Sequence, residues 1–371
     1  MLDALGIINF EDDTANIEGL GEYRPAAAIS CMGRYRMIDF ILSDMTNSGI
    51  SHIQVYPKNK PRSLIEHLGT GAHYNINNKR GKLHILYGEQ NFSSPVYNHD
   101  IANFMQNMQY IEEDMDPYVV MAPSYFIYNI DFNEVMKVHL SSKADITVLY
   151  TATDEAKTSY LGCDVLQMDK NKRVTSIEKN RGKNKNRFIS MEAYVLTKKL
   201  FIELVRKAAE TSALYWFKDI LADSCEELDI RGYNVKGYVA CINSLHEYYR
   251  ISMQLRDPAV AEQLFRPERP IYTITNDSCP TRYSEHAQVS GSVVANGCVV
   301  DGTVKDSILG RNVTVQEGAV VKNCIILPGA YIGKGAKLDH VVVDKSAIIH
   351  HVKELKGTDQ QPVYVKRRDR I

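Results

Sequence analysis

The sequence predicts an α/β protein in two parts: a Rossmann-like domain with a mixed, mainly parallel sheet, followed by a left-handed parallel β-helix. Strand-like and helix-like stretches alternate through the first two thirds of the 371 residues, which is typical of a largely parallel sheet with helices on both faces. After about residue 284, the apolar residues recur every six positions instead. We therefore expect a first domain at 1–245, a helix and linker at 246–283, and the β-helix with a C-terminal tail at 284–371.

The alternating part is divided by its apolar periods and by turn residues. Apolar residues at helical spacing predict an early helix that Gly49 can end. Ser63 and Glu66 have the spacing of a capping box for a short helix that Gly69 can stop. The expected strands are 5–10, 52–57, 118–122, 145–152, 162–167, 172–177, 188–196 and 233–242. The expected helices are 34–50, 63–71, 100–114, 132–142, 198–210 and 215–228.

The six-residue period indicates a β-helix, because each turn stacks its aliphatic side chains on the next and no single turn buries a core alone. A β-sandwich of alternating strands is the alternative, but two unbroken registers of three are hard to obtain from it. The apolar positions six apart are Val294 and Val300, then Leu309, Val315 and Val321, then Ile326, Ile332 and Leu338.

The composition argues against several classes of partner. Charged residues make up 24% and the formal net charge is -1, so nothing global favours a nucleic acid or a membrane surface as partner. No apolar run approaches the roughly 20 residues that a membrane-spanning helix needs, and the start lacks a signal-peptide pattern. The 7 cysteines are scattered and form no C-x-x-C pair, which favours reduced thiols in a cytoplasmic protein.

Several stretches of the sequence resemble one family. "RPAAAISCMGRYRMIDFILSDMTNSGI" at 24–50 is similar to K-P-A-V-x-F-G-G-K-Y-R-I-I-D-F-x-L-S-N-x-x-N-S-G-I of the ADP-glucose pyrophosphorylases, or glucose-1-phosphate adenylyltransferases. "IANFMQN" at 101–107, "IEKN" at 177–180 and "SMEAYVL" at 190–196 resemble the family's T-A-N-A-I-x-Q-N, F-E-E-K-P and S-M-G-I-Y-I-F. This resemblance covers nearly the whole chain. It implies a nucleotidyltransferase domain before the β-helix, and a tetramer that makes ADP-glucose from ATP and glucose-1-phosphate for bacterial glycogen.

The sequence departs from this family where the ATP phosphates would bind. The family has a strand followed by G-G-x-G-x-R-L, whose glycines let backbone N–H groups approach the phosphates. The corresponding stretch here is "NFEDDTANIEG", and Glu11, Asp12 and Asp13 stand where a triphosphate would lie. One facing unit charge at about 4 Å costs on the order of 4 kcal/mol at an effective dielectric near 20. The triplet could instead be a solvated turn, but in both interpretations the phosphate loop is lost.

Both metal-binding aspartates of the family are replaced as well. Tyr125 stands at the fourth position of the family's L-S-G-D-H-I-Y-K-M-D, and Cys241 stands at the aspartate of G-Y-W-K-D-V-G-T. Mg²⁺ prefers hard oxygen ligands, so a phenol and a thiol are poor substitutes. Tyr125 alone could be a core tyrosine. Together, the losses predict a chain with no catalytic residues and no metal or cofactor of its own, and Mg²⁺ would be used by a catalytic partner.

Other positions keep charges that suit phosphorylated ligands. Glu178, Lys179 and Ser190 match family positions that hold glucose-1-phosphate, although Lys179 also opens a basic run that could be a solvated loop. In this family the effector site lies between the N-terminal K-P-A…K-Y-R stretch and the β-helix. The candidate effector residues in that stretch are Arg24, Arg34 and Arg36, whose alternative role is pairing with Asp39 or Asp44. The basic tail at 366–370 could add to an anion site or be a solvated end.

An intact scaffold around an emptied site resembles the GlgD-type companion subunits of this family. The resemblance implies a regulatory pseudoenzyme that forms a heterotetramer with catalytic chains, forms a homo-oligomer in their absence, and responds to a sugar-phosphate effector. One rival hypothesis is an active sugar-phosphate nucleotidyltransferase in which Asp131 or Asp164 binds the metal. An acyltransferase is another, because hexapeptide β-helices also occur in such enzymes. The third rival is a sugar-phosphate sensor that needs no partner chain.

Overall fold

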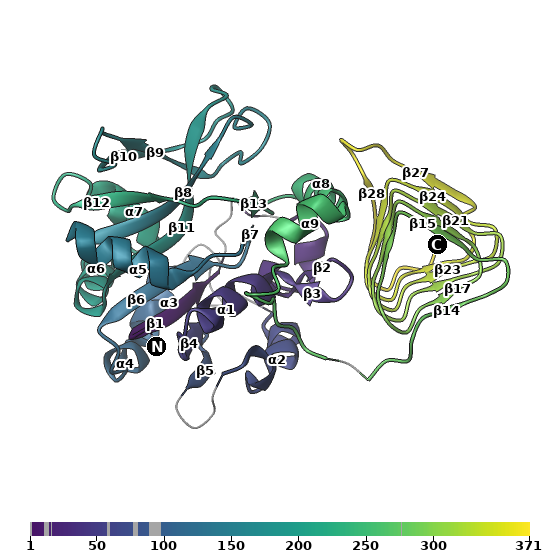
Figure 1. Ribbon diagram of the computed structural model, residues 1–371, viewed down its shortest axis with the longest axis horizontal. Coiled ribbons are helices and arrows are strands. Elements are labelled where there is room, and N and C mark those ends of the chain that lie inside the picture. Colours follow the sequence, from purple (N-terminus) through teal and green to yellow (C-terminus); the bar gives the residue numbers. More distant parts are fainter. Residues whose placement is uncertain are drawn as a thin grey trace.

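The computed structural model shows an α/β domain and a β-helix side by side, with α8 (Leu245–Leu255) and α9 (Pro258–Leu264) on the side of the domain that faces the β-helix (Figure 1). The structure describes residues 2–10, 15, 17–57, 60–76, 81–88, 98–275 and 277–371. The acidic triplet Glu11, Asp12 and Asp13 lies outside these residues. In the part of the chain that is described, no helix is both long and apolar enough to cross a bilayer.

The α/β domain is built on one mixed sheet, which confirms the predicted fold class. Its strands are β1 (Ala4–Asn9), β4 (His52–Val55), β5 (Lys82–Ile85), β6 (Tyr118–Pro123), β8 (Ile146–Thr153), β9 (Asp164–Met168), β10 (Val174–Lys179), β11 (Arg187–Thr197) and β12 (Ile230–Asn234). β1 is parallel to both β4 and β6, and β4 is parallel to β5. β11 pairs antiparallel with β6, β8 and β9, and β12 runs parallel to β8.

Helices cover both faces of this sheet, because successive residues of its central strands point into two different apolar cores. Val120 and Ala122 of β6 belong to one core, and Val119 and Met121 belong to the other. The first core includes α1 (Met37–Asn47), α2 (Arg62–Leu68) and α5 (Phe132–Ser142). The second includes α3 (Asp100–Gln106), α4 (Met108–Glu112), α6 (Lys198–Thr211) and α7 (Phe217–Asp223).

The capping box predicted for α2 is wrong. The helix begins at Arg62 after Pro61, and no side chain caps it. The fixed backbone torsion of Pro61 suits a helix start, so Ser63 falls inside the first turn instead of preceding it. The Ser63 hydroxyl is buried without a hydrogen-bond partner among the described residues. Gly69 ends the helix with a φ of 52°, as predicted.

Two stretches that were expected to be single elements are each divided. The stretch 100–114 forms α3 and α4, which are separated at Asn107, whose amide group donates a 2.9 Å hydrogen bond to the Asn103 carbonyl. Such a side-chain bond competes with the helical backbone bonds. In the stretch 233–242, β12 ends at Asn234, and the short β13 (Ala240–Cys241) pairs with β7 (Phe126–Ile127) outside the main sheet. This pairing places Cys241 beside the strand that follows Tyr125.

The β-helix has three parallel five-stranded sheets, which form the triangular coil in Figure 1. Its strands are β14 (Arg282–Tyr283), β15 (Gln288–Ser290), β16 (Val293–Val294), β17 (Val299–Val300), β18 (Thr303–Lys305), β19 (Ile308–Leu309), β20 (Thr314–Val315), β21 (Val320–Lys322), β22 (Ile325–Ile326), β23 (Tyr331–Ile332), β24 (Lys337–Asp339), β25 (Val341–Val343), β26 (Ile348–Ile349), β27 (Glu354–Lys356) and β28 (Val363–Val365). Leu309, Val315 and Val321 lie on the three sides of one coil and are fully buried in its core. The six-residue spacing therefore marks successive sides of a coil, and the predicted hexapeptide β-helix is confirmed.

One side of the β-helix shares a core with the α/β domain. The strands of this side are apolar at both alternating positions: Ile308 packs on the domain while Leu309 faces the coil interior, and Ile325 and Ile326 repeat this arrangement. The backbone also approaches closely, since a Cβ atom on Gly33 would lie 2.9 Å from the Leu309 carbonyl oxygen. The two units are therefore packed together by a continuous apolar interface.

Polar contacts reinforce this interface. Tyr249 on α8 donates a 2.8 Å hydrogen bond to the Asn323 carbonyl of the β-helix. Arg256 at the end of α8 lies 2.7 Å from the Asp306 carboxylate. Helix α8 thus connects the β-helix to the domain, because the neighbouring Tyr248 donates a 2.8 Å hydrogen bond to the Ser30 carbonyl of the domain.

Candidate functional site

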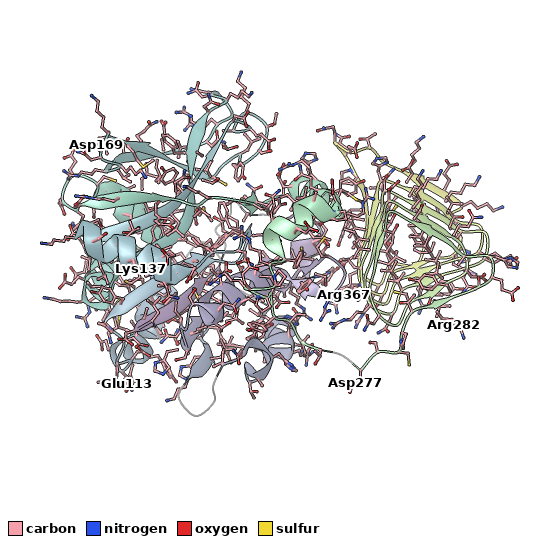
Figure 2. The ribbon with its side chains drawn as sticks, in the orientation of Figure 1. Glu113, Lys137, Asp169, Asp277, Arg282 and Arg367 are labelled. Atoms are coloured by element: carbon pink, nitrogen blue, oxygen red, sulfur yellow. The ribbon has the colours of Figure 1, made fainter. Side chains whose placement is uncertain are left out.

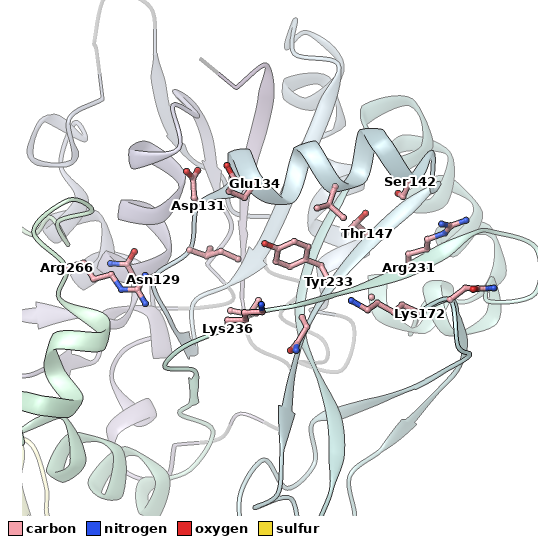
Figure 3. A pocket seen from close by; sticks show the side chains of 16 residues that line it. Asn129, Asp131, Glu134, Ser142, Thr147, Lys172, Arg231, Tyr233, Lys236 and Arg266 are labelled. Carbon is pink, nitrogen blue, oxygen red and sulfur yellow. The ribbon is translucent and has the colours of Figure 1, made fainter.

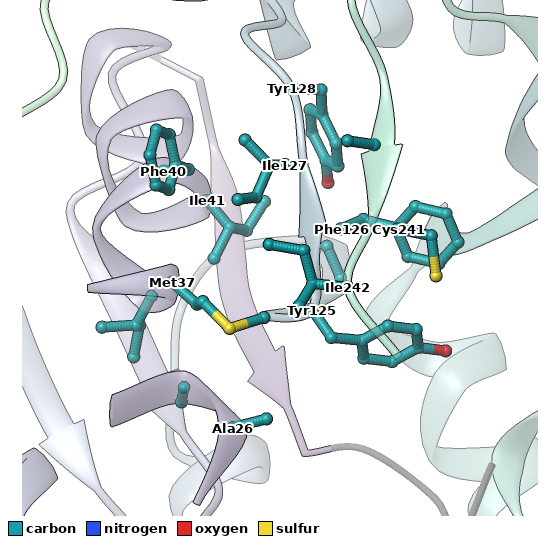
Figure 4. Packing of buried hydrophobic residues seen from close by; sticks show 14 of the residues in the cluster. Ala26, Met37, Phe40, Ile41, Tyr125, Phe126, Ile127, Tyr128, Cys241 and Ile242 are labelled. Carbon is teal, nitrogen blue, oxygen red and sulfur yellow. The ribbon is translucent and has the colours of Figure 1, made fainter. Parts of the chain in front are cut away.

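The candidate site lies at the carboxyl ends of β1 and β6, where ligands bind in open α/β sheets. β6 ends at Pro123, and the chain continues through Ser124 and Tyr125 into β7. Tyr125 is only 1% exposed and packs in the apolar core beside Phe126, with 5.0 Å between the ring centroids. Figure 4 shows Tyr125 among Met37, Ile127 and other apolar side chains. The environment is that of a core tyrosine.

Cys241 lies next to this strand end and is 2% exposed. The carbonyl of Tyr125 accepts a 2.8 Å hydrogen bond from the backbone N–H of Ile242, so the two segments are in direct contact. The Cys241 sulfur lies 3.5 Å from the sulfur of Cys163, which is also buried. Burial, followed by the hydrogen bond and charge of Cys163, raises the pKa of the Cys241 thiol well above its usual value. A buried phenol and a protonated thiol do not fit Mg²⁺.

The two other carboxylates considered as metal ligands have partners of their own. Asp131 accepts a 2.9 Å hydrogen bond from the backbone N–H of Asn133 at the start of α5. Burial raises the pKa of Asp131, but the hydrogen bonds from Asn133 and the charge of Arg269 outweigh burial and lower it. Asp164 lies 2.6 Å from the Lys179 ammonium group. Neither arrangement favours a metal site built on Asp131 or Asp164.

Asp131 also lines a groove of about 570 Å³ on the α5 side of the sheet (Figure 3). Tyr233 lies in the middle of this groove, with Glu134 on one side and Lys172 and Lys236 on the other. Neither Tyr125 nor Cys241 contributes to it. The groove is therefore separate from the site at Tyr125 and Cys241.

The candidate sugar-phosphate residues lie on neighbouring strands but do not converge. Lys179 on β10 faces Asp164 on β9, with which it is in register. Ser190 on β11 is buried, and its hydroxyl accepts a 3.2 Å hydrogen bond from the backbone N–H of Glu192. Successive residues of a strand point to opposite faces, so Glu178 points away from Lys179 and lies 3.5 Å from Arg187. The structure brings together Lys179 and Asp164, while Glu178 points to the opposite face of the strand and lies near Arg187.

Sequence reasoning missed three further ionisable groups, Lys218, Glu192 and Asp100. The Lys218 ammonium group on α7 lies 3.3 Å from the Glu192 carboxylate, and both side chains are largely buried. Asp100 at the start of α3 accepts a 2.9 Å hydrogen bond from the Asn9 amide at the end of β1. Burial raises the pKa of Asp100 to about 7, although the hydrogen bond from Asn9 acts in the opposite direction. A signal for Glu192 was available, because it occupies the glycine position of the S-M-G motif quoted above.

The candidate effector arginines have three different environments. Arg24 is 2% exposed and forms an ion pair with the fully buried Asp344 of the β-helix, so its predicted alternative pairing with Asp39 or Asp44 is wrong. Its Nε and Nη1 atoms have no hydrogen-bond partner among the described residues. Arg36 donates to the Ser63 carbonyl oxygen. Arg34 is exposed, and its guanidinium lies 5.4 Å from the centre of the neighbouring Tyr35 ring.

The junction around Arg24 carries more positive than negative charge. Burial and, to a smaller extent, the charges of Arg36 and Arg24 lower the pKa of Lys345 to about 7. Arg367 of the C-terminal tail also acts on Lys345 and lies where the two units meet (Figure 2). Asp344 is the acidic group that opposes this effect. The junction therefore has the electrostatic character of an anion site, and the tail contributes one cation to it.

An anion bound at this junction should bind less tightly as the pH rises. The folded-state pKa of Lys345 is about 7, against about 10.4 in an unfolded chain, so Lys345 loses its proton above pH 7 in the folded protein. Bound sulfate would favour the charged form, so we expect proton uptake on binding and an affinity that falls by up to about tenfold per pH unit above 7. Isothermal titration with sulfate, which does not titrate in this range, measures both quantities.

The matched control is Lys345→Met, which removes the titrating group. This variant should bind sulfate more weakly at pH 7 and lose the pH dependence between pH 7 and 9. A wild-type affinity that stays constant over this range would contradict the assignment.

Comparisons with known proteins agree with this architecture. A mixed, mainly parallel sheet that is followed by a hexapeptide coil defines a protein of the nucleotidyltransferase class. The Nucleotidyl transferase family model matches residues 18–243, and the model for the GlmU-like C-terminal hexapeptide matches residues 279–362. The glycogen biosynthesis protein GlgD of Geobacillus stearothermophilus is 36% identical over 98% of this chain and 96% of that protein.

Two further relatives are similar to this chain over nearly its whole length. The glycogen biosynthesis protein GlgD of Bacillus subtilis is 31% identical over 98% of this chain and 95% of that protein. The glucose-1-phosphate adenylyltransferase of Fervidobacterium nodosum is 26% identical over 94% of this chain and 84% of that protein. The chain belongs to the nucleotidyl transferase family and, within it, to the family of the GlgD glycogen biosynthesis proteins.

Proposed function

We propose that this chain is a regulatory, non-catalytic subunit that acts in glycogen biosynthesis by assembling with a catalytic glucose-1-phosphate adenylyltransferase chain. The GlgD relatives carry the name of glycogen biosynthesis proteins, and a more distant relative carries the name of the enzyme. In this proposal, the partner binds Mg²⁺ and makes ADP-glucose from ATP and glucose-1-phosphate in the cytoplasm. Tyr125 and Cys241 of the present chain contribute no metal ligand in this proposal.

The observation that carries the proposal is the pair of positions Tyr125 and Cys241. Both side chains are almost fully buried at the end of β6, and neither offers the anionic oxygen that Mg²⁺ prefers. Nucleotidyl transfer depends on neutralising the phosphate charges, which is worth several kcal/mol of barrier. The pairing of Asp164 with Lys179 counts against a rescue by that carboxylate.

The junction between the two units supports the regulatory half of the proposal. Arg24, Arg36 and Lys345 meet there from both units, and a phosphorylated effector would supply the missing negative charge. The chain would form a heterotetramer with catalytic subunits and shift them toward their active conformation. Coupling between sites of this kind typically amounts to about 1–3 kcal/mol.

The purified chain alone is expected to make ADP-glucose at least about 1000-fold more slowly than a catalytic chain, because about 4 kcal/mol of transition-state stabilisation is lost with the metal. When the two chains are mixed, kcat or KM of the catalytic chain should change by roughly 5-fold to 150-fold. A coupled assay of pyrophosphate release measures both effects.

An equal amount of an unrelated protein is the control for non-specific stabilisation of the catalytic chain. Synthesis by the lone chain at a rate comparable to that of the catalytic chain would contradict the proposal. Size-exclusion chromatography of the mixture separates it from the third rival, because a sensor that works alone would elute apart from the catalytic chain.

A further inference from the structure

Glu192 has a backbone conformation that a glutamate rarely adopts. Its φ is 51°, in the left-handed region, and it lies in the middle of β11, where the register with β8 shifts between Ser190 and Ala193. A side chain in this region costs roughly 1 kcal/mol or more, and such residues persist where the surrounding structure over-determines them. The contacts of its side chain therefore indicate what this conformation achieves.

The strained backbone conformation of Glu192 places its carboxylate next to the buried Lys218. The Lys218 ammonium group lies 3.3 Å from the Glu192 carboxylate, and the two side chains are 9% and 14% exposed. A buried ammonium group is costly without a counter-charge. Glu192 supplies this charge from the neighbouring strand, while its backbone N–H donates to the Ser190 hydroxyl and fixes the bulge.

The pair lies close to the ion pair between Lys179 and Asp164. Glu192, Lys218 and Asp164 all act electrostatically on the buried Tyr194 of β11, and Glu192 also acts on Cys241. The Lys179 ammonium group is likewise neutralised internally, at 2.6 Å from Asp164. Each of these two lysines is therefore satisfied by a carboxylate of the chain itself.

We propose that Glu192 is a built-in anion, which fills on Lys218 the position that a phosphate group or a similar small oxyanion would otherwise occupy. The Lys218 ammonium group is then closed to such ligands by the chain's own carboxylate. This inference rests on the proposed function and deepens it, since it explains how the buried Lys218 stays stable without a ligand. Its test needs only this chain, so it can fail while the role as a companion subunit stands.

The test replaces Glu192 and measures the binding of inorganic phosphate. Glu192→Gly removes the carboxylate and relieves the left-handed strain, and Glu192→Gln removes the charge while keeping the length of the side chain. Isothermal titration with phosphate should show one additional site in each variant, with an affinity about tenfold or more above any binding of wild type at this position. Thermal melting in phosphate against chloride should show a Tm increase of several degrees that wild type lacks.

Two controls make the result specific. In Glu192→Gly combined with Lys218→Met, both charges are gone, so the variant should fold without the additional site and without the additional Tm increase. Glu203→Gln removes an exposed glutamate that lies 3.9 Å from Lys199 on α6, and it should bind phosphate as wild type does. Phosphate binding at the junction around Arg24 is common to all variants and cancels in the comparison.

The proposal is overturned if folded Glu192→Gly and Glu192→Gln bind no more phosphate than wild type. It is equally overturned if the gain persists after Lys218 is replaced. If Glu192→Gly does not fold in chloride, recovery of folding in phosphate supports the proposal, whereas failure to fold in both salts combined with a phosphate-insensitive Glu192→Gln overturns it.

Discussion

Replacing Asp344 by asparagine is expected to lower the free energy of unfolding by about 3–5 kcal/mol, because the buried guanidinium of Arg24 would lose its counter-charge. Arg24 and Asp344 are 2% and 0% exposed, so water cannot compensate for the loss. Tyr364 donates a 2.8 Å hydrogen bond to the same carboxylate oxygen, and the neutral amide oxygen of asparagine would be a weaker acceptor. Urea denaturation followed by circular dichroism measures the effect as a lower midpoint.

An exposed ion pair provides the matched control. Lys334 and Glu317 lie 2.7 Å apart with side chains that are 75% and 57% exposed, so Glu317→Gln should change stability by less than about 1 kcal/mol. A double variant with Arg24→Met and Asp344→Leu should be more stable than Asp344→Asn, because no charge is left buried. Equal midpoints for Asp344→Asn and Glu317→Gln would show that the buried pair does not stabilise the junction.

Restoring an aspartate at Tyr125 and at Cys241 is expected to give a protein whose stability depends on Mg²⁺. Without the ion, two carboxylates would be buried in an apolar core, which costs several kcal/mol. The two segments are in contact through Ile242, and the Tyr125 ring and the Cys241 sulfur extend to the same side in Figure 4, so the new carboxylates should share one ion. Differential scanning calorimetry with and without Mg²⁺ measures the recovery.

The two single variants are the controls, since one carboxylate should be destabilising without gaining a comparable response to Mg²⁺. ADP-glucose synthesis should remain absent in the double variant, because the sequence after β1 still lacks the glycine loop. A double variant that is destabilised but unaffected by Mg²⁺ would show that positions 125 and 241 no longer face a common site.

The predictable part of this fold rests on periodic patterns. Leu309, Val315 and Val321 are six residues apart, and their stacking requires no knowledge of distant contacts. The break at Asn107 and the start of α2 after Pro61 were missed, because local side-chain bonding and proline geometry decided them. Ile325 and Ile326 are apolar at two successive positions. This pattern in the sequence indicates that one side of the coil is covered on both faces.

The only feature of the candidate site that could be predicted from the sequence is the replacement of its metal ligands. The replacements at Tyr125 and Cys241 follow from comparing short motifs, and the structure shows both side chains buried. The partner of Arg24 could not be predicted, because Asp344 is 320 positions away and several acidic residues were closer in sequence. The conformation of Glu192 could not be predicted either, since its φ follows from packing around the bulge of β11.

The ion pair between Arg24 and Asp344 also restricts the number of coils that can precede Asp344 in the β-helix. Neighbouring coils are spaced about 4.8 Å apart along the axis, so inserting or deleting one coil before Asp344 would carry the carboxylate that far from the guanidinium. Repeats of this kind are usually free to vary in number, but here Arg24, which lies outside the repeat, limits the number of coils. Lineages that change the length of the coil before this point should therefore also have replaced the arginine.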